Sequence, residues 1–141
     1  MKKIISLLLA LVLTLSLTLV FTSCELFDSG SAYDDLTDTE KKLFDAFLEA
    51  IDESYNPSKI KILKVSYLSI RDDGTVYATM QIQGTNGLGG TITQWNTLMN
   101  WDGGGYFFME SSEGKGNAMA KEVSVAKLND ALAEYWTNLG I

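Results

Sequence analysis

Residues 72–83, Asp-Asp-Gly-Thr-Val-Tyr-Ala-Thr-Met-Gln-Ile-Gln, decide the fold, because a tight-turn signal is followed at once by strict alternation. An Asp-Gly step favours the short loop of a β-hairpin. From Thr75 to Gln83 the apolar residues Val76, Ala78, Met80 and Ile82 alternate with Tyr77, Thr79, Gln81 and Gln83. Successive side chains of a strand point to opposite faces, so this stretch predicts a half-buried strand paired with the segment before it.

Three more strands are predicted around this one. Lys59 to Arg71 is rich in Ile, Leu, Val and Tyr. Its alternation slips between Ile62 and Leu63, which indicates a β-bulge or a strand covered on both faces. Thr91 to Trp101 alternates and places Trp95, Met99 and Trp101 on one side, and Tyr106 to Glu110 forms a short strand. Glycine-rich turns at 84–90 and 102–105 separate the strands.

Two amphipathic helices flank the strands. Thr37 and Glu40 have the spacing of a capping box at the start of a helix over 37–55, and Asn56-Pro57 ends it. Its apolar stripe is Leu43, Phe44, Phe47, Leu48 and Ile51. Ser124 caps a second helix, which Gly140 ends, after a polar loop at 111–122. The stripe of this second helix is Val125, Leu128, Leu132, Tyr135 and Leu139.

This order of elements predicts an α+β fold: a four-stranded antiparallel meander sheet with an N-terminal and a C-terminal helix packed on one face. Residues 37–141 are predicted to form a single globular domain. The leading helix followed by an antiparallel sheet is similar in outline to cystatin-like folds. That resemblance is carried by element order and by no motif, and it implies an inhibitor-like domain as the weakest functional alternative.

The first 24 residues have the layout of a bacterial export signal. Lys2 and Lys3 precede an apolar stretch over residues 4–21, and Thr22-Ser23 supplies small residues before Cys24. Phe21-Thr22-Ser23-Cys24 resembles the lipobox of bacterial lipoproteins, although Phe21 stands where leucine is most common. The resemblance implies that residues 1–23 are removed and that acyl chains such as palmitate are attached through Cys24. Residues 24–36 would then be a lipidated tether, holding the domain at the outer face of the inner or outer membrane.

Two other interpretations of this segment remain open. At roughly 18 residues the apolar stretch is barely long enough for an uncleaved membrane helix. However, Ser6, Thr14, Ser16 and Thr18 interrupt it, and no basic cluster follows Phe21. The chain could also be an ordinary secreted protein whose only cysteine is a free thiol. The lipoprotein interpretation is favoured because the only cysteine falls where small residues end the signal.

The charge of the chain argues against nucleic acid as a partner. The formal net charge is −7, from 11 basic and 18 acidic residues. Removal of Lys2 and Lys3 leaves 9 basic residues against 18 acidic ones, so the mature net charge is −9. This sign opposes binding to phosphate backbones and to anionic lipid headgroups. Attachment to the membrane must therefore come from the lipid on Cys24.

The residues that most enzymes use are missing from the sequence. It contains no histidine, and the anchor uses its only cysteine, so we expect no catalytic residue, no metal site and no cofactor. The acidic residues fall mainly on helix faces and turns, where solvation explains them. Asp72-Asp73-Gly74 and residues 100–103 superficially resemble calcium-binding loops. Neither has the full ligand spacing of an EF-hand, so both are predicted to be hairpin turns. The glycine-rich segment 84–90 precedes a strand and not the helix N-terminus that a phosphate loop needs.

Aromatic residues on the strands are the remaining candidates for ligand binding. Trp95, Trp101, Tyr77 and Tyr106 fall on strands of the predicted sheet, and Tyr67 has no assignable face. Large aromatics are usually mostly buried, so a place in the core is favoured for them. The sequence thus predicts a non-catalytic, lipid-anchored domain that binds a protein or an envelope component. The alternative is a carbohydrate-binding module that stacks sugars on these aromatics.

Overall fold

The computed structural model describes residues 30–51 and 56–141. Residues 31–141 form one compact unit, and every buried apolar residue in it lies between Leu36 and Trp136. This unit therefore has a complete core of its own. Among the helices within the described ranges, none has the length and apolar character needed to cross a membrane. The predicted signal and Cys24 lie outside the described residues.

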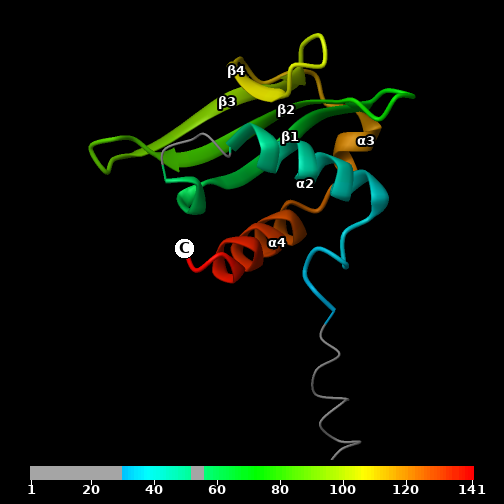
Figure 1. Cartoon of the computed structure of the whole chain (residues 1–141). Coiled ribbons are helices and arrows are strands. Elements are labelled where there is room, and N and C mark those ends of the chain that lie inside the picture. Colours follow the sequence, from blue (N-terminus) through cyan, green and yellow to red (C-terminus); the bar gives the residue numbers. More distant parts are fainter. Residues whose placement is uncertain (1–29, 52–55) are drawn as a thin grey trace, which may run out of the picture. The chain divides into compact units, whose positions relative to one another are not determined.

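The sheet is the predicted four-stranded antiparallel meander (Figure 1). Its strands are β1 (Lys61–Ile70), β2 (Val76–Thr85), β3 (Thr91–Asn100) and β4 (Tyr106–Glu110), in the order β1-β2-β3-β4. The predicted slip in β1 is confirmed, because the β1–β2 register shifts between Ile62 and Lys64. A second shift, between Val65 and Tyr67, was not predicted. The two shifts let Ile62, Val65, Leu68 and Ile70 all share one face of the sheet.

Both long helices lie on that face of the sheet, as predicted, and confirm the α+β class (Figure 1). Helix α2 (Asp38–Ile51) begins with the predicted capping box. The Thr37 amide donates to Glu40 Oε2 at 2.8 Å, and the Glu40 amide donates to Thr37 Oγ1 at 3.2 Å. Helix α4 (Val125–Asn138) begins with the predicted cap, since the Lys127 amide donates to Ser124 Oγ.

The predicted stripe of α4 is wrong in its second half. Tyr135 and Leu139 are exposed, whereas Trp136 is 6% exposed and belongs to the core. Tyr135 and Trp136 lie three and four residues after Leu132, so helical spacing allows either side chain to face the core. Packing against the rest of the domain buries Trp136 and leaves Tyr135 exposed. A short helix, α3 (Ala118–Lys121), lies in the segment predicted as a polar loop, and a 3-10 turn, η1 (Pro57–Lys59), precedes β1.

The core fills the space between the sheet and the helices. β2 contributes the four residues predicted from its alternation, and β3 contributes Leu98, which is fully buried. Leu36 is also buried, and Ala32 and Tyr33 pack against the core. The compact unit thus begins at Ser31, within the range that the sequence analysis assigned to the tether.

Local hydrogen bonds close the three reversals between strands, including the last one, where the Gly104 amide donates to Trp101 O at 3.1 Å. At the first, the Gly74 amide donates to Arg71 O, and the Thr75 amide donates to Asp73 Oδ1 at 2.8 Å. The Thr75 hydrogen bonds lower the pKa of the Asp73 carboxyl. Within 86–90, Asn86 Oδ1 accepts from the amides of Leu88 and Gly90, and strand β3 follows directly.

Candidate functional site: the open face of the sheet

The face of the sheet opposite the helices carries most of the strand aromatics. The register places Tyr67, Tyr77, Trp95 and Phe107 on this face, which we call the open face. Trp101 lies in the turn after β3 and is 70% exposed. The expectation that these aromatics form the core is therefore wrong for Tyr77 and Trp101, and Trp95 is only half-buried.

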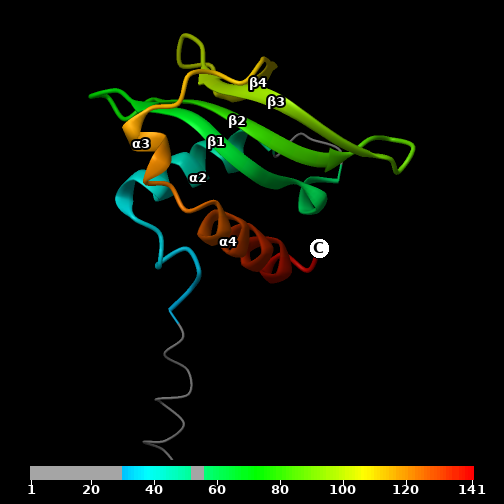
Figure 2. The same ribbon diagram turned by 180° about the vertical axis from the view of Figure 1, so that it is seen from behind.

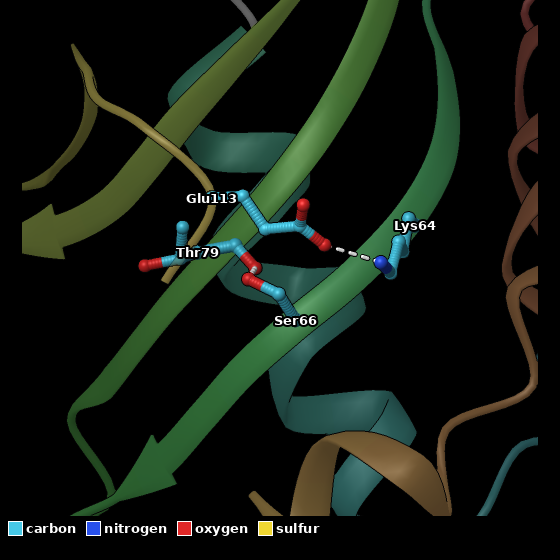
Figure 3. Close-up of polar contacts among 4 residues, drawn as sticks. All are labelled: Lys64, Ser66, Thr79 and Glu113. Atoms are coloured by element: carbon cyan, nitrogen blue, oxygen red, sulfur yellow. Dashed lines mark hydrogen bonds and ion pairs between the residues drawn. The ribbon is translucent and has the colours of Figure 1, made fainter. Parts of the chain in front are cut away.

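A segment of chain crosses the open face. Residues 111–117, which we call the strap, run from the end of β4 across the sheet to α3 beside β1 (Figure 2). The Ser111 amide donates to Trp95 O at 3.0 Å, and Glu113 pairs with Lys64 of β1 (Figure 3). Gly114 lies over Thr79 and Ser66, where an added Cβ would be 3.9 Å from their side chains.

Three polar residues beneath the strap are buried although they face away from the helices. Ser66, Thr79 and Thr97 are each no more than 6% exposed. Ser66 Oγ donates to Thr79 O at 3.2 Å (Figure 3), and the hydroxyls of Thr79 and Thr97 are 3.3 Å apart. These bonds satisfy groups that would otherwise be costly to bury. Because the strap crosses the middle of the open face, it separates an apolar end of this face from a polar end.

The end nearest the β1–β2 and β3–β4 turns is apolar. Tyr77, Phe107 and Met109 are 39%, 41% and 51% exposed. Tyr67 and Met99 lie half-buried beside them, and the rings of Tyr67 and Tyr77 meet edge to face at 5.9 Å. We call these five residues the apolar end.

The other end is polar and centres on Trp95. Gln81 pairs with Trp95 across β2 and β3, and Lys64 Nζ lies 5.7 Å from the centre of the indole ring. Glu113 of the strap forms an exposed ion pair with Lys64. This polar end therefore sets a half-buried aromatic ring beside an amide, an ammonium and a carboxylate, which is the composition of a site for polar, ring-shaped ligands.

Tyr106, the fourth predicted ligand-binding residue, faces the helices and has a structural role. Its hydroxyl oxygen accepts from the Val76 amide at 2.8 Å, and the side chain packs against the core. The prediction of a binding role for Tyr106 lacks a geometric basis, because its polar atom is already bonded across the sheet.

A cavity of about 270 Å³ opens on the helix side, at the end of the sheet near the β2–β3 loop. Among the described residues that line it, apolar side chains are the majority, Gln94 and Asn96 supply the amides, and none is charged. Gln94 Nε2 donates to Asn96 Oδ1 at 3.2 Å. Within the two described ranges, no cluster of three or more His, Cys, Asp or Glu residues could hold a metal ion.

No protein-family model, no curated protein and no solved structure matches this chain.

Proposed function

We propose that this chain is a lipid-anchored, non-catalytic protein of the bacterial cell envelope whose domain binds a protein or an envelope component through the apolar end. The observation that carries the proposal is the exposure of Tyr77, Phe107 and Met109 together on the face of the sheet opposite the helices that the structure describes. Contiguous exposed apolar groups of this kind are typical of interaction surfaces, because leaving them in water is unfavourable.

The anchor part of the proposal rests on residues 1–24 of the sequence. Replacing Cys24 with alanine is expected to abolish metabolic labelling with a radioactive fatty acid and to release the protein from the membrane fraction. The sulfur of Cys24 is the proposed attachment atom, and stable anchoring needs two or more acyl chains. A Ser23→Ala variant, which keeps a small residue before the cysteine, should be labelled normally. Persistent labelling of the Cys24→Ala protein would contradict the anchor.

A second candidate function, carbohydrate binding, is favoured by the polar end. Sugar rings stack on aromatic faces while amide and charged groups bond their hydroxyls, and Trp95, Gln81 and Glu113 offer both. This site is separate from the apolar end because the strap lies between them. The two candidate functions can therefore be tested by substitutions in different places.

Co-sedimentation with isolated bacterial cell envelopes tests the apolar end. Residues 25–141 are expected to bind, and Tyr77→Ser is expected to weaken binding by about 30-fold if the ring is a hot spot worth about 2 kcal/mol. Leu88→Ser is the matched control, because Leu88 is 97% exposed in the β2–β3 loop. Wild-type affinity of the Tyr77→Ser protein would remove the apolar end from the proposal.

The same assay separates the two candidate functions. If the partner is a protein, protease treatment of the envelopes should abolish binding while Trp95→Ala leaves it unchanged. If the ligand is a glycan, purified peptidoglycan or polysaccharide should retain the domain, and Trp95→Ala should release it. Circular dichroism of each variant establishes that the domain remains folded.

A further inference from the structure

The two edge strands of the sheet, β1 and β4, differ in how far side chains bond their outward backbone groups. At the β1 edge, the side chain of Asn129 in α4 bonds both the amide and the carbonyl of Ile62, at 3.0 and 2.7 Å. Asn117 bonds both groups of Leu68 in the same way, at 3.2 and 2.6 Å. Each asparagine thus replaces the backbone of a neighbouring strand. The β1 edge is closed to further pairing at these two points.

The β4 edge is bonded by a side chain at one amide, that of Tyr106, and its other outward backbone groups are available. Because Ser111 donates to Trp95 O, the odd-numbered residues of β4 bond inward to β3. The Tyr106 amide instead donates outward, to Glu49 Oε1 at 3.1 Å. Phe108 and Glu110 have the same parity as Tyr106, so their amides and carbonyls also point outward. In the described part of the chain, neither outward amide has a hydrogen-bond partner.

The side chains next to this edge are apolar and complementary to themselves. An antiparallel copy of β4 centred on Phe108 would exchange two hydrogen bonds between the Phe108 residues. It would also join the Glu110 amides to the Tyr106 carbonyls, and the Glu110 carbonyls would replace the exposed Glu49 carboxylates on the Tyr106 amides. On the open face, Phe107 would then lie opposite Met109 of the second copy, so the two exposed apolar side chains cover each other. Glu110 would lie opposite Tyr106, and no like charges of β4 would face each other.

We infer that two copies of this chain pair through β4 to form a continuous eight-stranded sheet, with the dyad at Phe108. We assign the pairing partner as a second copy of this chain because a single register gives partners to the outward amides of Phe108 and Glu110. The same register covers the exposed side chains of Phe107 and Met109. The strap does not obstruct this pairing, since it leaves the end of β4 across the sheet and away from the edge (Figure 2). The inference rests on the β4 edge and not on the identity of the ligand. The pairing covers Phe107 and Met109 and leaves Tyr77 of β2 outside the contact between the two copies.

Disulfide trapping tests the register. The chain's only cysteine is Cys24, so residues 25–141 contain no thiol. Phe107 and Met109 of the second copy would form a non-hydrogen-bonded pair with Cα atoms about 4.5 Å apart, within the range that a disulfide spans. Mixing Phe107→Cys protein with Met109→Cys protein under mild oxidation is expected to give a disulfide-linked heterodimer. Equal cross-linking in either variant alone, or none in the mixture, would overturn the inference.

Sedimentation velocity tests the association itself. Residues 25–141 are expected to shift from monomer to dimer as concentration rises, and Met109→Lys should abolish the shift. Leu88→Lys is the matched control and should dimerise normally. A wild-type chain that stays monomeric throughout would overturn the inference and would leave the β4 edge for an extended segment of another protein. Tyr77→Ser lies on β2, away from the pairing edge, so this variant is expected to dimerise normally while its envelope binding is weakened. A failure of this inference is thereby distinguished from a failure of the proposed function.

Discussion

Replacing Glu40 with alanine is expected to lower the free energy of unfolding by about 3–5 kcal/mol, because two hydrogen bonds to a buried charged group are lost together. Glu40 is 2% exposed. Its Oε2 accepts from the Thr37 amide at the start of α2, at 2.8 Å. Its Oε1 accepts from the Ser124 amide at the start of α4, at 2.7 Å. One carboxylate thus joins the N-termini of both long helices, where negative charge is also favoured by the helix dipoles.

The contribution of Glu40 should also depend on pH. Burial alone would raise the pKa of its carboxyl, but hydrogen bonds from Ser124 and Thr37, together with the Lys127 charge, outweigh burial and lower it. A carboxyl whose pKa is lowered on folding stabilises the native state fully above the unfolded pKa, about 4.3. That stabilisation is lost as the pH falls through the lower folded pKa. Glu40→Gln should therefore remove part of the acid-induced loss of stability seen in the wild type.

Urea denaturation of residues 25–141 between pH 3 and pH 7 measures both effects. Glu122→Ala is the matched control, because Glu122 is an exposed carboxylate at the end of α3. It should change the unfolding midpoint little, since exposed charges contribute little to stability. A Glu40→Ala protein as stable as the Glu122→Ala control would contradict the joining role of Glu40.

Local sequence patterns predicted much of this fold because the residues that interact in those patterns are close together in the chain. The capping box joins residues three apart, and the alternation of β2 needs only the pleat of a strand. The second partner of Glu40 is different, since Ser124 is 84 residues away. No local pattern in the sequence indicates that bond, which depends on how the helices pack.

The candidate site was predicted only in part for the same reason. The alternation of β3 correctly placed Trp95 and Met99 on one face, but it could not tell which face the helices cover. The strap has no hydrophobic period, so the sequence does not indicate that it passes over Ser66 and Thr79. That course buries polar residues and leaves Tyr77 exposed, which is the reverse of what residue type alone predicts.

The second large effect is expected at the β1 edge, where Asn117 and Asn129 each replace a neighbouring strand. Loss of either side chain leaves an amide and a carbonyl of β1 without partners, at a cost of about 2 kcal/mol. Asn117 also caps α3, because its Oδ1 accepts from the Ala120 amide at 3.1 Å. Ile62 and Leu68 are six residues apart along an extended strand, about 20 Å. The two losses should therefore add, and the double alanine variant should lose about 4 kcal/mol.

The direction of the stability change in Asn129→Ala distinguishes the loss of the bonds to Ile62 from an effect of helix propensity. Alanine is a better helix former than asparagine, so Asn→Ala in a helix is neutral or stabilising when the side chain makes no tertiary contact. Asn138, exposed at the end of α4, provides that control. Asn129→Ala should destabilise the domain in urea denaturation while Asn138→Ala does not. Asn129→Asp, which keeps an acceptor for the Ile62 amide but loses the donor to its carbonyl, should fall between them. Equal stability of the Asn129→Ala, Asn129→Asp and Asn138→Ala proteins would mean that the bonds to Ile62 contribute nothing to stability.

The double variant, Asn117→Ala with Asn129→Ala, also tests whether the two asparagines keep β1 from pairing with other chains. If β4 is the one open edge of the sheet, a double variant that remains folded should aggregate with time, because its β1 edge is then open as well.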